Sequence, residues 1–339
     1  MRRVCMLREK TTHSPVAVIG SGSWGTALAI LLARNGCAVR LWGVAPEIQA
    51  LMQNRRSIYL PEVELPETIS LFLDLEEALH GVHDVLIAVP SFVFRSTLKL
   101  IKPYLASDAR LFWGTKGLDS SDKLLSAVVK EEVGEIPIAI LSGPTFASEV
   151  ARGLPTAITV AVTNSDFAAD LSRYLHGGNF RVYISNDLIG VQICGAVKNV
   201  LAIAVGISDG LGFGSNARCA LITRGLAEMM RLGKALGGMP ETFMGLAGLG
   251  DLVLTCTDDK SRNRRFGLAI GRGCDSKQAQ QDIKQVVEGV SNAKSVHLLA
   301  QSMKIEVPIA DQVYCILYEG LSPHEAVAAL FKRAQKAER

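Results

Sequence analysis

Short β-branched runs alternate with helical patterns in the first half of the chain. The runs that predict strands span residues 15–19, 37–42, 84–89, 110–113, 138–141, 157–162 and 181–184. Strands that alternate with helices are typical of a parallel sheet covered by helices on both faces. We therefore expect an α/β fold whose N-terminal domain is a Rossmann-type, doubly wound sheet.

The strand pattern stops after about Asn186, and helix follows helix to Arg339. Glycine-rich breaks separate the predicted helices at residues 206–214, 237–240 and 245–250. The chain is also longer than one hydrophobic core usually supports. The pattern predicts a flexible tail over residues 1–14, an α/β domain over 15–189 and an all-helical domain over 190–339, with a ligand site between the two domains.

One segment, residues 190–207, is apolar enough to suggest a membrane span. Lys198 and Asn199 lie at its centre. A central lysine costs about 2.5 to 3.5 kcal/mol in lipid on insertion scales. We therefore predict a buried helix of a soluble domain and no membrane span.

Composition narrows the choice of partners. Lys and Arg total 36 against 33 for Asp and Glu, and this net charge of +3 is too small to favour nucleic acid or a membrane surface. Seven cysteines are scattered without a C-x-x-C pair, and the six histidines show no metal-ligand spacing. We expect a cytoplasmic protein that binds a small molecule and has no metal site.

A G-x-G-x-x-G motif at Gly20, Gly22 and Gly25 follows the first predicted strand and opens a helix. Gly20 permits a tight turn, Gly22 lets the backbone approach a pyrophosphate, and Gly25 lets the helix pack on the strand. The helix N-terminus adds positive dipole. The context predicts a bound dinucleotide, and the alternative is a merely structural glycine turn.

Three further polar or glycine-rich segments each follow a predicted strand directly. They are residues 89–91, 114–117 and 142–147. Ligands of open α/β sheets bind outside the carboxyl ends of the strands, so these segments should meet at the edge that carries the glycine loop. Lys116 then points at the site, and the alternative is an ordinary surface lysine.

Lys198 interrupts a helix that is otherwise almost wholly apolar. An unpaired buried charge costs several kcal/mol, so a buried lysine indicates a use for the charge. Burial lowers the pKa of an ammonium group towards neutrality, which suits a general acid that protonates a carbonyl oxygen. The alternative is that the side chain extends along the helix to solvent. Asn199 is positioned to orient this lysine or a substrate oxygen.

Two acidic residues have both a structural and a functional interpretation. Asp251 follows the glycine turn of residues 245–250 and precedes an apolar run, so it is either a helix N-cap or a carboxylate that holds the Lys198 ammonium. Glu288, in V-V-E-G, is either a ligand of ribose hydroxyls or a surface glutamate.

The segment that starts at Ser261 packs three arginines into five residues, S-R-N-R-R. A hydroxyl, a guanidinium and an amide at Ser261, Arg262 and Asn263, at the start of a helical run, predict a phosphate receptor. Charge clusters are usually solvated faces, and Arg264 and Arg265 fit that description.

With these residues in place, the sequence resembles bacterial NAD(P)-dependent glycerol-3-phosphate dehydrogenases from about residue 15 to residue 333. The segments that carry the resemblance are G-S-G-S-W-G-T-A-L-A from Gly20, G-T-K-G-L from Gly114, L-S-G-P-T-F-A from Leu141, C-G-A-V-K-N-V from Cys194, G-L-A-G-L-G-D-L-V-L-T-C-T from Gly245, S-R-N-R-R-F-G from Ser261 and V-V-E-G from Val286. The resemblance implies that Lys198 transfers the proton, with Lys116 and Asp251 beside it. Substrate contacts are implied for Lys116, Gly143, Thr145, Asp251, Ser261, Arg262 and Asn263. Cofactor contacts are implied for Ser23, Trp24, Lys116, Ala147, Arg262, Val286 and Glu288.

The resemblance also implies an activity: hydride transfer between NAD(P)H and dihydroxyacetone phosphate, which gives sn-glycerol 3-phosphate for phospholipid synthesis. A cytoplasmic homodimer is implied as well. The residues by themselves leave two alternatives open, a dehydrogenase of another small hydroxy acid and a dinucleotide-binding sensor without turnover.

The choice between NADH and NADPH depends on the residues after the second strand. Enzymes that are strict for NAD usually place an acid there, which binds the ribose 2′-hydroxyl and repels a 2′-phosphate. Here the strand ends in Gly43-Val44-Ala45, with no acid before Glu47, and several relatives carry a histidine where Val44 stands. We therefore expect NADPH to be accepted at least as well as NADH.

Overall fold

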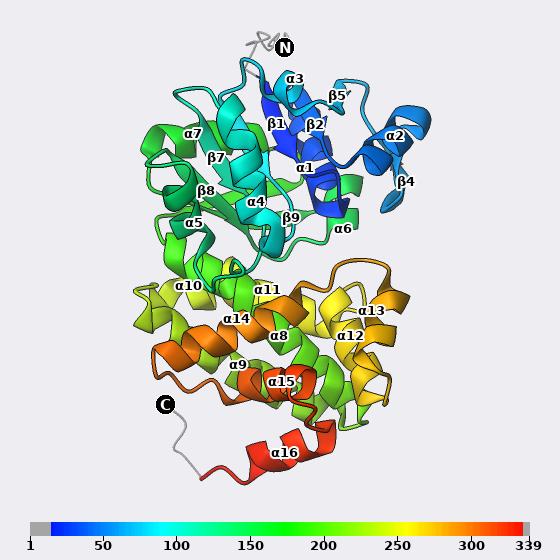
Figure 1. Cartoon of the computed structure of the whole chain (residues 1–339), viewed down its shortest axis with the longest axis vertical. Coiled ribbons are helices and arrows are strands. Elements are labelled where there is room, and N and C mark those ends of the chain that lie inside the picture. Colours follow the sequence, from blue (N-terminus) through cyan, green and yellow to red (C-terminus); the bar gives the residue numbers. More distant parts are fainter. Residues whose placement is uncertain (1–14, 335–339) are drawn as a thin grey trace, which may run out of the picture.

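The structure is a computed structural model that describes residues 15–334, so the tail predicted over residues 1–14 lies outside the described residues. An α/β part and a helical part lie end to end along the long axis (Figure 1). The strands are β1 (Val16–Ile19), β2 (Val39–Trp42), β3 (Arg56–Ser57), β4 (Leu60–Glu64), β5 (Ile69–Phe72), β6 (Asp84–Ile87), β7 (Arg110–Trp113), β8 (Ile138–Ser142), β9 (Thr156–Val162) and β10 (Phe180–Ser185). The helices of the α/β part are α1 (Ser23–Arg34), α2 (Ala45–Asn54), α3 (Leu75–Leu79), α4 (Ser91–Ile101) with a short 3₁₀ turn (Lys102–Tyr104), α5 (Leu125–Glu132), α6 (Ala147–Arg152) and α7 (Ser165–Leu175).

Eight strands form one sheet in the order β10-β9-β8-β7-β6-β1-β2-β5. From β5 to β8 this is the doubly wound order in which the chain runs outward from a central β1 on both sides. All seven predicted strands are present. Edge strand β5 and the small β3–β4 hairpin are not predicted by the pattern, because these short segments are partly exposed and β4 contains a proline and two glutamates.

The sheet is not wholly parallel, and this corrects the prediction. β9 runs antiparallel to β8, and β10 then runs parallel to β9. The helix between β8 and β9 is α6, which has six residues. A helix of that length advances only about 9 Å, too little to carry the chain back to the start of a neighbouring parallel strand. The chain therefore turns at Gly153, whose φ is +76°, and returns antiparallel.

Helices cover both faces of the sheet because successive side chains of a strand point to opposite sides. Val16 and Val18 of β1 belong to a hydrophobic cluster with α1, α6 and α7, whereas Ala17 and Ile19 belong to one with α3, α4 and α5. The second cluster continues through α8 into the helical part. The two parts thus share one continuous core.

The helical part is built around one long helix. Its elements are α8 (Leu188–Gly210), α9 (Gly214–Ala235), α10 (Pro240–Met244), a wide helical turn (Leu246–Gly250), α11 (Asp251–Thr257), α12 (Arg262–Gly271), α13 (Ser276–Ile283), α14 (Glu288–Ser302), α15 (Pro308–Tyr318) and α16 (Pro323–Phe331). Helix α8 packs against α9, α11, α12, α14 and α15. At its start, the Asp187 carboxylate accepts hydrogen bonds from Gly190 N (2.8 Å), Met239 N (2.8 Å) and Thr242 Oγ1 (2.6 Å), which fastens α8 to α10.

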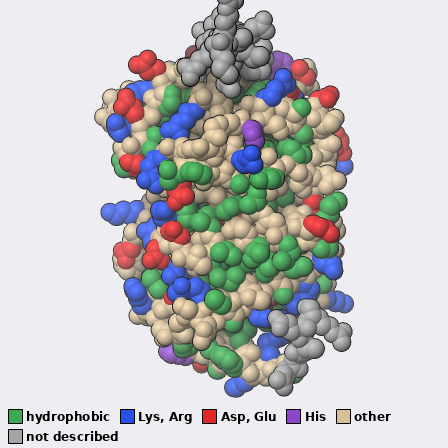
Figure 2. Space-filling model, turned by 180° about the vertical axis from the view of Figure 1, so that it is seen from behind, with side chains coloured by type: hydrophobic (Ala, Val, Ile, Leu, Met, Phe, Trp, Pro, Cys, Tyr) green, Lys and Arg blue, Asp and Glu red, His purple; other side chains and the backbone are tan. Residues whose placement is uncertain are grey.

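Helix α8 is the one helix of the described residues that is long and apolar enough to cross a membrane. In the most apolar stretch of this helix, 83% of the residues are buried inside the protein, as the central lysine led us to expect. On the molecular face seen in Figure 2, acidic and basic side chains are interspersed and neither sign predominates.

Glycines set the distance between α8 and α12, and the break predicted over residues 206–214 lies between Gly210 and Gly214. Helix α8 continues through Gly206 to Gly210, because both glycines face the backbone of α12. A Cβ at Gly206 would overlap the Arg264 carbonyl oxygen, and a Cβ at Gly267 would overlap that of Ile203. This close crossing holds the first turn of α12 beside the middle of α8.

We predict that Gly267→Ala destabilises the protein by about 1 to 3 kcal/mol, because the added methyl group forces the two backbones apart. Helix propensity alone would act in the opposite direction, by up to about 1 kcal/mol. Urea unfolding checks the sign. A variant as stable as the parent would show that the crossing tolerates a wider spacing.

Candidate active site

A cleft of about 640 Å³ lies between the sheet edge and the helical part. It is lined by the glycine loop, by the segments that follow β2, β6, β7 and β8, and by residues of α8, α11, α12 and α14. The predicted residues that line it are Gly20, Gly22, Ser23, Trp24, Lys116, Thr145, Ala147, Lys198, Asn199, Asp251, Ser261, Arg262, Asn263, Val286 and Glu288. Gly25 and Gly143 lie behind the lining.

The glycine loop has the geometry that its sequence predicts. Gly20 has a φ of +115°, and a Cβ there would lie 2.7 Å from the Ala88 carbonyl oxygen. A Cβ at Gly25 would overlap the carbonyl oxygen of Gly20, whereas one at Gly22 would meet no atom within 4 Å. The N-cap of α1 is Gly22, which has no side chain to occupy the first N–H groups of the helix. Backbone N–H groups and a positive helix end therefore face an open part of the cleft, which fits a pyrophosphate.

An acid that sequence reasoning set aside lies beside this loop. Glu47, in the first turn of α2, accepts hydrogen bonds from the hydroxyls of Ser21 and, at 2.8 Å, Tyr59. Glu47 and Tyr59 both line the cleft. No acid stands at the end of β2, and the local pattern does not predict that α2 brings Glu47 to Ser21.

Arg40, Arg55 and Arg56, which lie on β2 or soon after it, all donate to groups that do not line the cleft. Arg40 donates to the carbonyls of Glu77 and His80, Arg55 to those of Leu65 and Pro66, and Arg56 to Pro61 and Glu64. Val44 is 58% exposed. None of these three arginines therefore supports the expectation that the protein accepts NADPH.

Two lysines share one buried carboxylate at the base of the cleft. Lys198 Nζ lies 2.8 Å from Asp251 Oδ1, and Lys116 Nζ lies 2.7 Å from Asp251 Oδ2. Lys116 also donates to the Gly143 carbonyl oxygen at 3.0 Å. Lys116 comes from the loop after β7 and Asp251 from α11, so this contact joins the two parts of the molecule (Figure 1).

Burial and charge set the protonation of this group. The pKa of Lys198 falls from 10.5 to about 8, because burial and the nearby Lys116 charge lower it by more than Asp251 raises it. Burial alone would raise the pKa of Asp251, but the two ammonium groups hold it below its usual value. Lys198 is 7% exposed, which excludes the alternative of a side chain that reaches solvent. The base of the cleft thus holds an ionised acid and a lysine that gives up its proton readily.

Asp251 is not a helix N-cap. Gly250 occupies that position, and the carboxylate of Asp251 points at the lysines. Thr255, one turn later on α11, accepts a hydrogen bond from Lys198 Nζ at 3.0 Å, and its hydroxyl donates to the Asp251 carbonyl oxygen at 2.6 Å. Sequence reasoning missed Thr255, although its spacing of four from Asp251 places both on one helix face.

The segment predicted to receive phosphate opens α12. Ser261 caps this helix and accepts from Arg264 N at 3.2 Å. Arg262 lines the cleft and has no ion pair or side-chain hydrogen bond within residues 15–334. Arg264 is not solvated as predicted, because it is 7% exposed and pairs with Asp209 and Asp259. The Arg262 guanidinium and the Ser261 hydroxyl can therefore bind an anion at a helix N-terminus.

Amide side chains connect this segment to two other helices. Asn263 Nδ2 donates to Asn199 Oδ1 on α8, and Asn263 Oδ1 accepts from Gly289 N on α14, both at 2.8 Å. Glu288 begins α14 and lines the cleft, so it is not the surface glutamate that the sequence left open. Burial raises the pKa of Glu288, and the charges of Arg262, Lys198 and Lys116 oppose that rise.

An ion pair beside the cleft joins the two parts of the molecule and was not predicted from the sequence. Lys260, from the helical part, lies 2.6 Å from Glu149 Oε1 on α6 and 5.6 Å from the centre of the Phe146 ring. Thr145, next to that ring, donates to the Gly143 carbonyl oxygen at 3.1 Å. No short motif marks such a pair, because its partners are 111 residues apart.

Both parts of the chain match the same protein family. Residues 15–168 match the NAD-dependent glycerol-3-phosphate dehydrogenase N-terminus, and residues 187–328 match the C-terminus of the same family. The chain is 55% identical over 328 residues to the glycerol-3-phosphate dehydrogenase (NAD(P)+) of Coxiella burnetii, with 96% of this chain and 98% of the other covered. It is 56% identical over 332 residues to the enzyme of that name from Klebsiella pneumoniae, with the same two shares covered.

Solved structures agree with the sequence matches. The crystal structure of glycerol-3-phosphate dehydrogenase from Coxiella burnetii superposes with a TM-score of 0.93 at 53% identity, over 95% of this chain and 100% of that one. A ketopantoate reductase from Ralstonia eutropha superposes with a TM-score of 0.60 at 18% identity, over 92% and 99% of the two chains. The latter likeness concerns the fold alone.

We predict that Asp251→Asn lowers the pKa of Lys198 to about one or two pH units below 8, because the carboxylate that favours the ammonium form is lost while the Lys116 charge stays. Titration of ¹³Cε-labelled lysines by NMR measures this pKa. Asp258→Asn, in the loop after α11, is the control and should leave it unchanged. A Lys198 pKa at or above 8 in Asp251→Asn would contradict the coupling.

Proposed function

Because the chain belongs to the family of NAD-dependent glycerol-3-phosphate dehydrogenases, we propose that Lys198, Lys116 and Asp251 carry its chemistry and that the start of α12 binds the substrate phosphate. The protein is an NAD(P)-dependent oxidoreductase that acts on a CH–OH group, converting between sn-glycerol 3-phosphate and dihydroxyacetone phosphate. Glycerol 3-phosphate made in this reaction is a building block for phospholipid synthesis. The single observation that carries the proposal is the buried Lys198–Asp251–Lys116 contact facing a dinucleotide-sized cleft.

The cofactor fits the wall formed by the α/β part. Gly22 leaves space for a pyrophosphate beside the uncapped start of α1, and Ser23, Trp24 and Ala147 line the same wall. Arg262, Val286 and Glu288 face it from the helical part. When bound, the reduced cofactor supplies the hydride that the ketone carbon of the substrate accepts.

Lys198 is the proposed proton donor to the ketone oxygen. Two of its three N–H groups have partners in Asp251 and Thr255, so one remains for the substrate. A pKa of about 8 makes the proton transferable near neutral pH. Lys116, fixed by Asp251 and Gly143, places a second positive charge where the oxygen becomes an alkoxide. Asn199 lies next to the donor and helps to orient the substrate.

The phosphate receptor consists of groups that the fold leaves available. The Ser261 oxygen accepts from Arg264 N, which leaves its hydroxyl proton to donate. Asn263 uses one amide hydrogen on Asn199 and keeps the other, and Arg262 supplies a two-pronged guanidinium. Thr145 lines the substrate side of the cleft, and Gly143, behind the lining, supports it through the carbonyl oxygen that holds Lys116 and Thr145. This receptor distinguishes the proposal from a dehydrogenase of an unphosphorylated hydroxy acid.

The proposal extends to the organisation of the chain. Residues 15–189 form the cofactor-binding domain and residues 190–339 the substrate domain, which is supported by the end of β10 at Ser185, the start of α8 at Leu188 and the two family matches.

The resemblance to the family supports a cytoplasmic homodimer. Light scattering measures the assembly, and a monomeric mass would contradict the homodimer.

We predict that Lys198→Ala lowers turnover by about 10² to 10⁴, the usual range for the loss of a positioned acid, while NADH still binds. In the parent, kcat/KM for dihydroxyacetone phosphate should fall above pH of about 8, because the ammonium form is lost there. Absorbance of the reduced nicotinamide follows both effects, with 2-keto acids as alternative substrates.

Lys294→Ala, an exposed lysine on α14, is the control and should behave as the parent. Near-parental turnover in Lys198→Ala would remove Lys198 from the mechanism. A parent that reduces 2-keto acids and not dihydroxyacetone phosphate would refute the substrate, and a parent that oxidises no NADH with either would indicate a sensor.

We predict that Arg262→Ala costs roughly 2 to 5 kcal/mol in kcat/KM for dihydroxyacetone phosphate, because the phosphate loses its main partner. Unphosphorylated dihydroxyacetone, which lacks the group that Arg262 binds, should react almost equally with parent and variant. A separate titration with NADH isolates any effect on the cofactor. Arg272→Ala, at the other end of α12, is the control. Equal losses for both ketones would place the phosphate elsewhere.

A further inference from the structure

The loop that carries Lys116 has little regular structure of its own. Residues 114–124 connect β7 to α5 without a helix or strand. Thr115 Oγ1 donates to the Val89 carbonyl oxygen at 2.7 Å, and Gly117 has a φ of +153°. Loops of this kind open more easily than the elements that flank them. Something beyond local backbone preference must fix the position of Lys116.

Asp119, three residues later, organises the loop. It is 1% exposed although it is charged. Its Oδ1 accepts from Ser121 N at 2.9 Å, Ser121 Oγ at 2.8 Å and Lys123 N at 3.1 Å. Burial would raise the pKa of Asp119, but these hydrogen bonds and the bond from Arg95 hold it below its usual value. The carboxylate therefore stays ionised and gathers residues 119–123 around itself.

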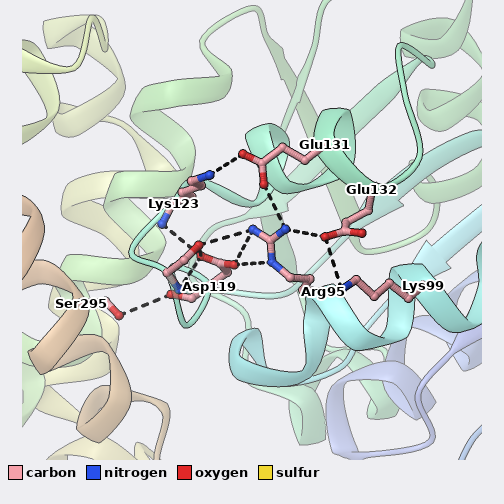
Figure 3. A network of polar contacts seen from close by, with 8 residues as sticks. Arg95, Lys99, Asp119, Lys123, Glu131, Glu132 and Ser295 are labelled. Atoms are coloured by element: carbon pink, nitrogen blue, oxygen red, sulfur yellow. Dashed lines mark hydrogen bonds and ion pairs between the residues drawn. The ribbon is translucent and has the colours of Figure 1, made fainter.

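Arg95 connects this carboxylate to two helices (Figure 3). From α4, its Nε and Nη2 both lie 2.8 Å from Asp119 Oδ2. Its Nη1 lies 2.5 Å from Glu132 Oε1 and 3.0 Å from Glu131 Oε2, at the end of α5. Lys123 in turn pairs with Glu131 at 2.5 Å. The loop is thus fastened to α4 at its middle and to α5 at its end.

Helix α14 contacts the opposite side of the loop. Ser295 Oγ lies 3.5 Å from the Asp119 carbonyl oxygen, and Figure 3 shows it reaching toward the loop from the helical part. Asn292 Nδ2 lies 3.5 Å from the Lys116 carbonyl oxygen. A Cβ at Gly117 would lie only 2.6 Å from Asn292 Oδ1. The Lys116 backbone is therefore confined between the Arg95 network and α14.

We propose that Arg95 and Asp119 are positioning residues for catalysis, which hold the loop so that the Lys116 ammonium reaches Asp251. Neither residue lines the cleft, so both act through Lys116. The inference rests on the proposed roles of Lys116 and Lys198. It adds a set of side chains outside the cleft on which the geometry of the charged centre depends.

Release of the loop has a consequence that a loss of stability alone does not produce. The charged groups that face Lys198 are Asp251 from α11, Lys116 from the loop and Glu288 from α14. Lys116 lowers the pKa of Lys198 and competes for Asp251. When the loop loosens and Lys116 withdraws, the Lys198 pKa rises. The fall of kcat/KM at alkaline pH then moves to higher pH.

The test compares Asp119→Asn and Arg95→Met with Lys99→Met. Lys99 also lies on α4, but its side chain is largely exposed. Its ammonium lies 3.9 Å from Glu132, a longer contact than that of Arg95. We expect both network variants to lose about 10-fold or more in kcat for dihydroxyacetone phosphate reduction. The alkaline limb of their kcat/KM profile, where kcat/KM falls as the pH rises, should move up by about 0.5 to 1 pH unit. Lys99→Met should match the parent, and Arg95→Lys should restore part of both effects.

Activity in the parent together with an unmoved alkaline limb in both variants would overturn the inference and leave the proposed function intact. An inactive parent would instead refute the proposed function. Thermal unfolding is measured for every variant. Failure of Asp119→Asn, Arg95→Met and Arg95→Lys to fold would assign Arg95 and Asp119 to stability alone, which also overturns the positioning role.

Discussion

The buried carboxylate of Asp251 is the constraint on which the site depends. Two ammonium groups at its two oxygens would repel each other without it, and the carboxylate would take up a proton in this environment without them. Removal of the carboxylate leaves two buried ammonium groups without a compensating charge, which is strongly destabilising. Because Lys116 belongs to the α/β part and Asp251 to the helical part, the same contact closes the interface between the two parts and tunes the pKa of Lys198.

The rest of the fold delivers these side chains to one place. The sheet brings the ends of β1, β6, β7 and β8 to a common edge, which is why segments far apart in sequence line one cleft. The glycine crossing of α8 and α12 places Arg262, which has no side-chain partner within residues 15–334, on the same cleft as Lys198. In the proposed complex one small substrate would place its phosphate at the start of α12 and its ketone at Lys198, so that the energy of phosphate binding orients the reacting carbon.

Fold and function are determined by different features here. A ketopantoate reductase shares the architecture at a TM-score of 0.60 and only 18% identity, so the two-part plan does not specify the substrate. In the proposed function, the substrate is selected by particular groups, above all Ser261, Arg262 and Asn263. These groups are available to an anion because Arg264 forms the ion pairs with Asp209 and Asp259. The sequence alone does not distinguish Arg264 from the arginines beside it.

The sequence by itself determined what depends on local pattern. Seven strands, the glycine loop and the buried helix around Lys198 follow from hydrophobic period, from spacing and from the cost of burying a charge. The tertiary structure decided what depends on long-range contact. It turned β9 antiparallel because α6 is too short, kept α8 helical through Gly206 because α12 needs the space, and placed Glu47 beside Ser21. It also paired Arg95 with Asp119. Such pairings arise between residues that are far apart in the chain, so no local pattern encodes them.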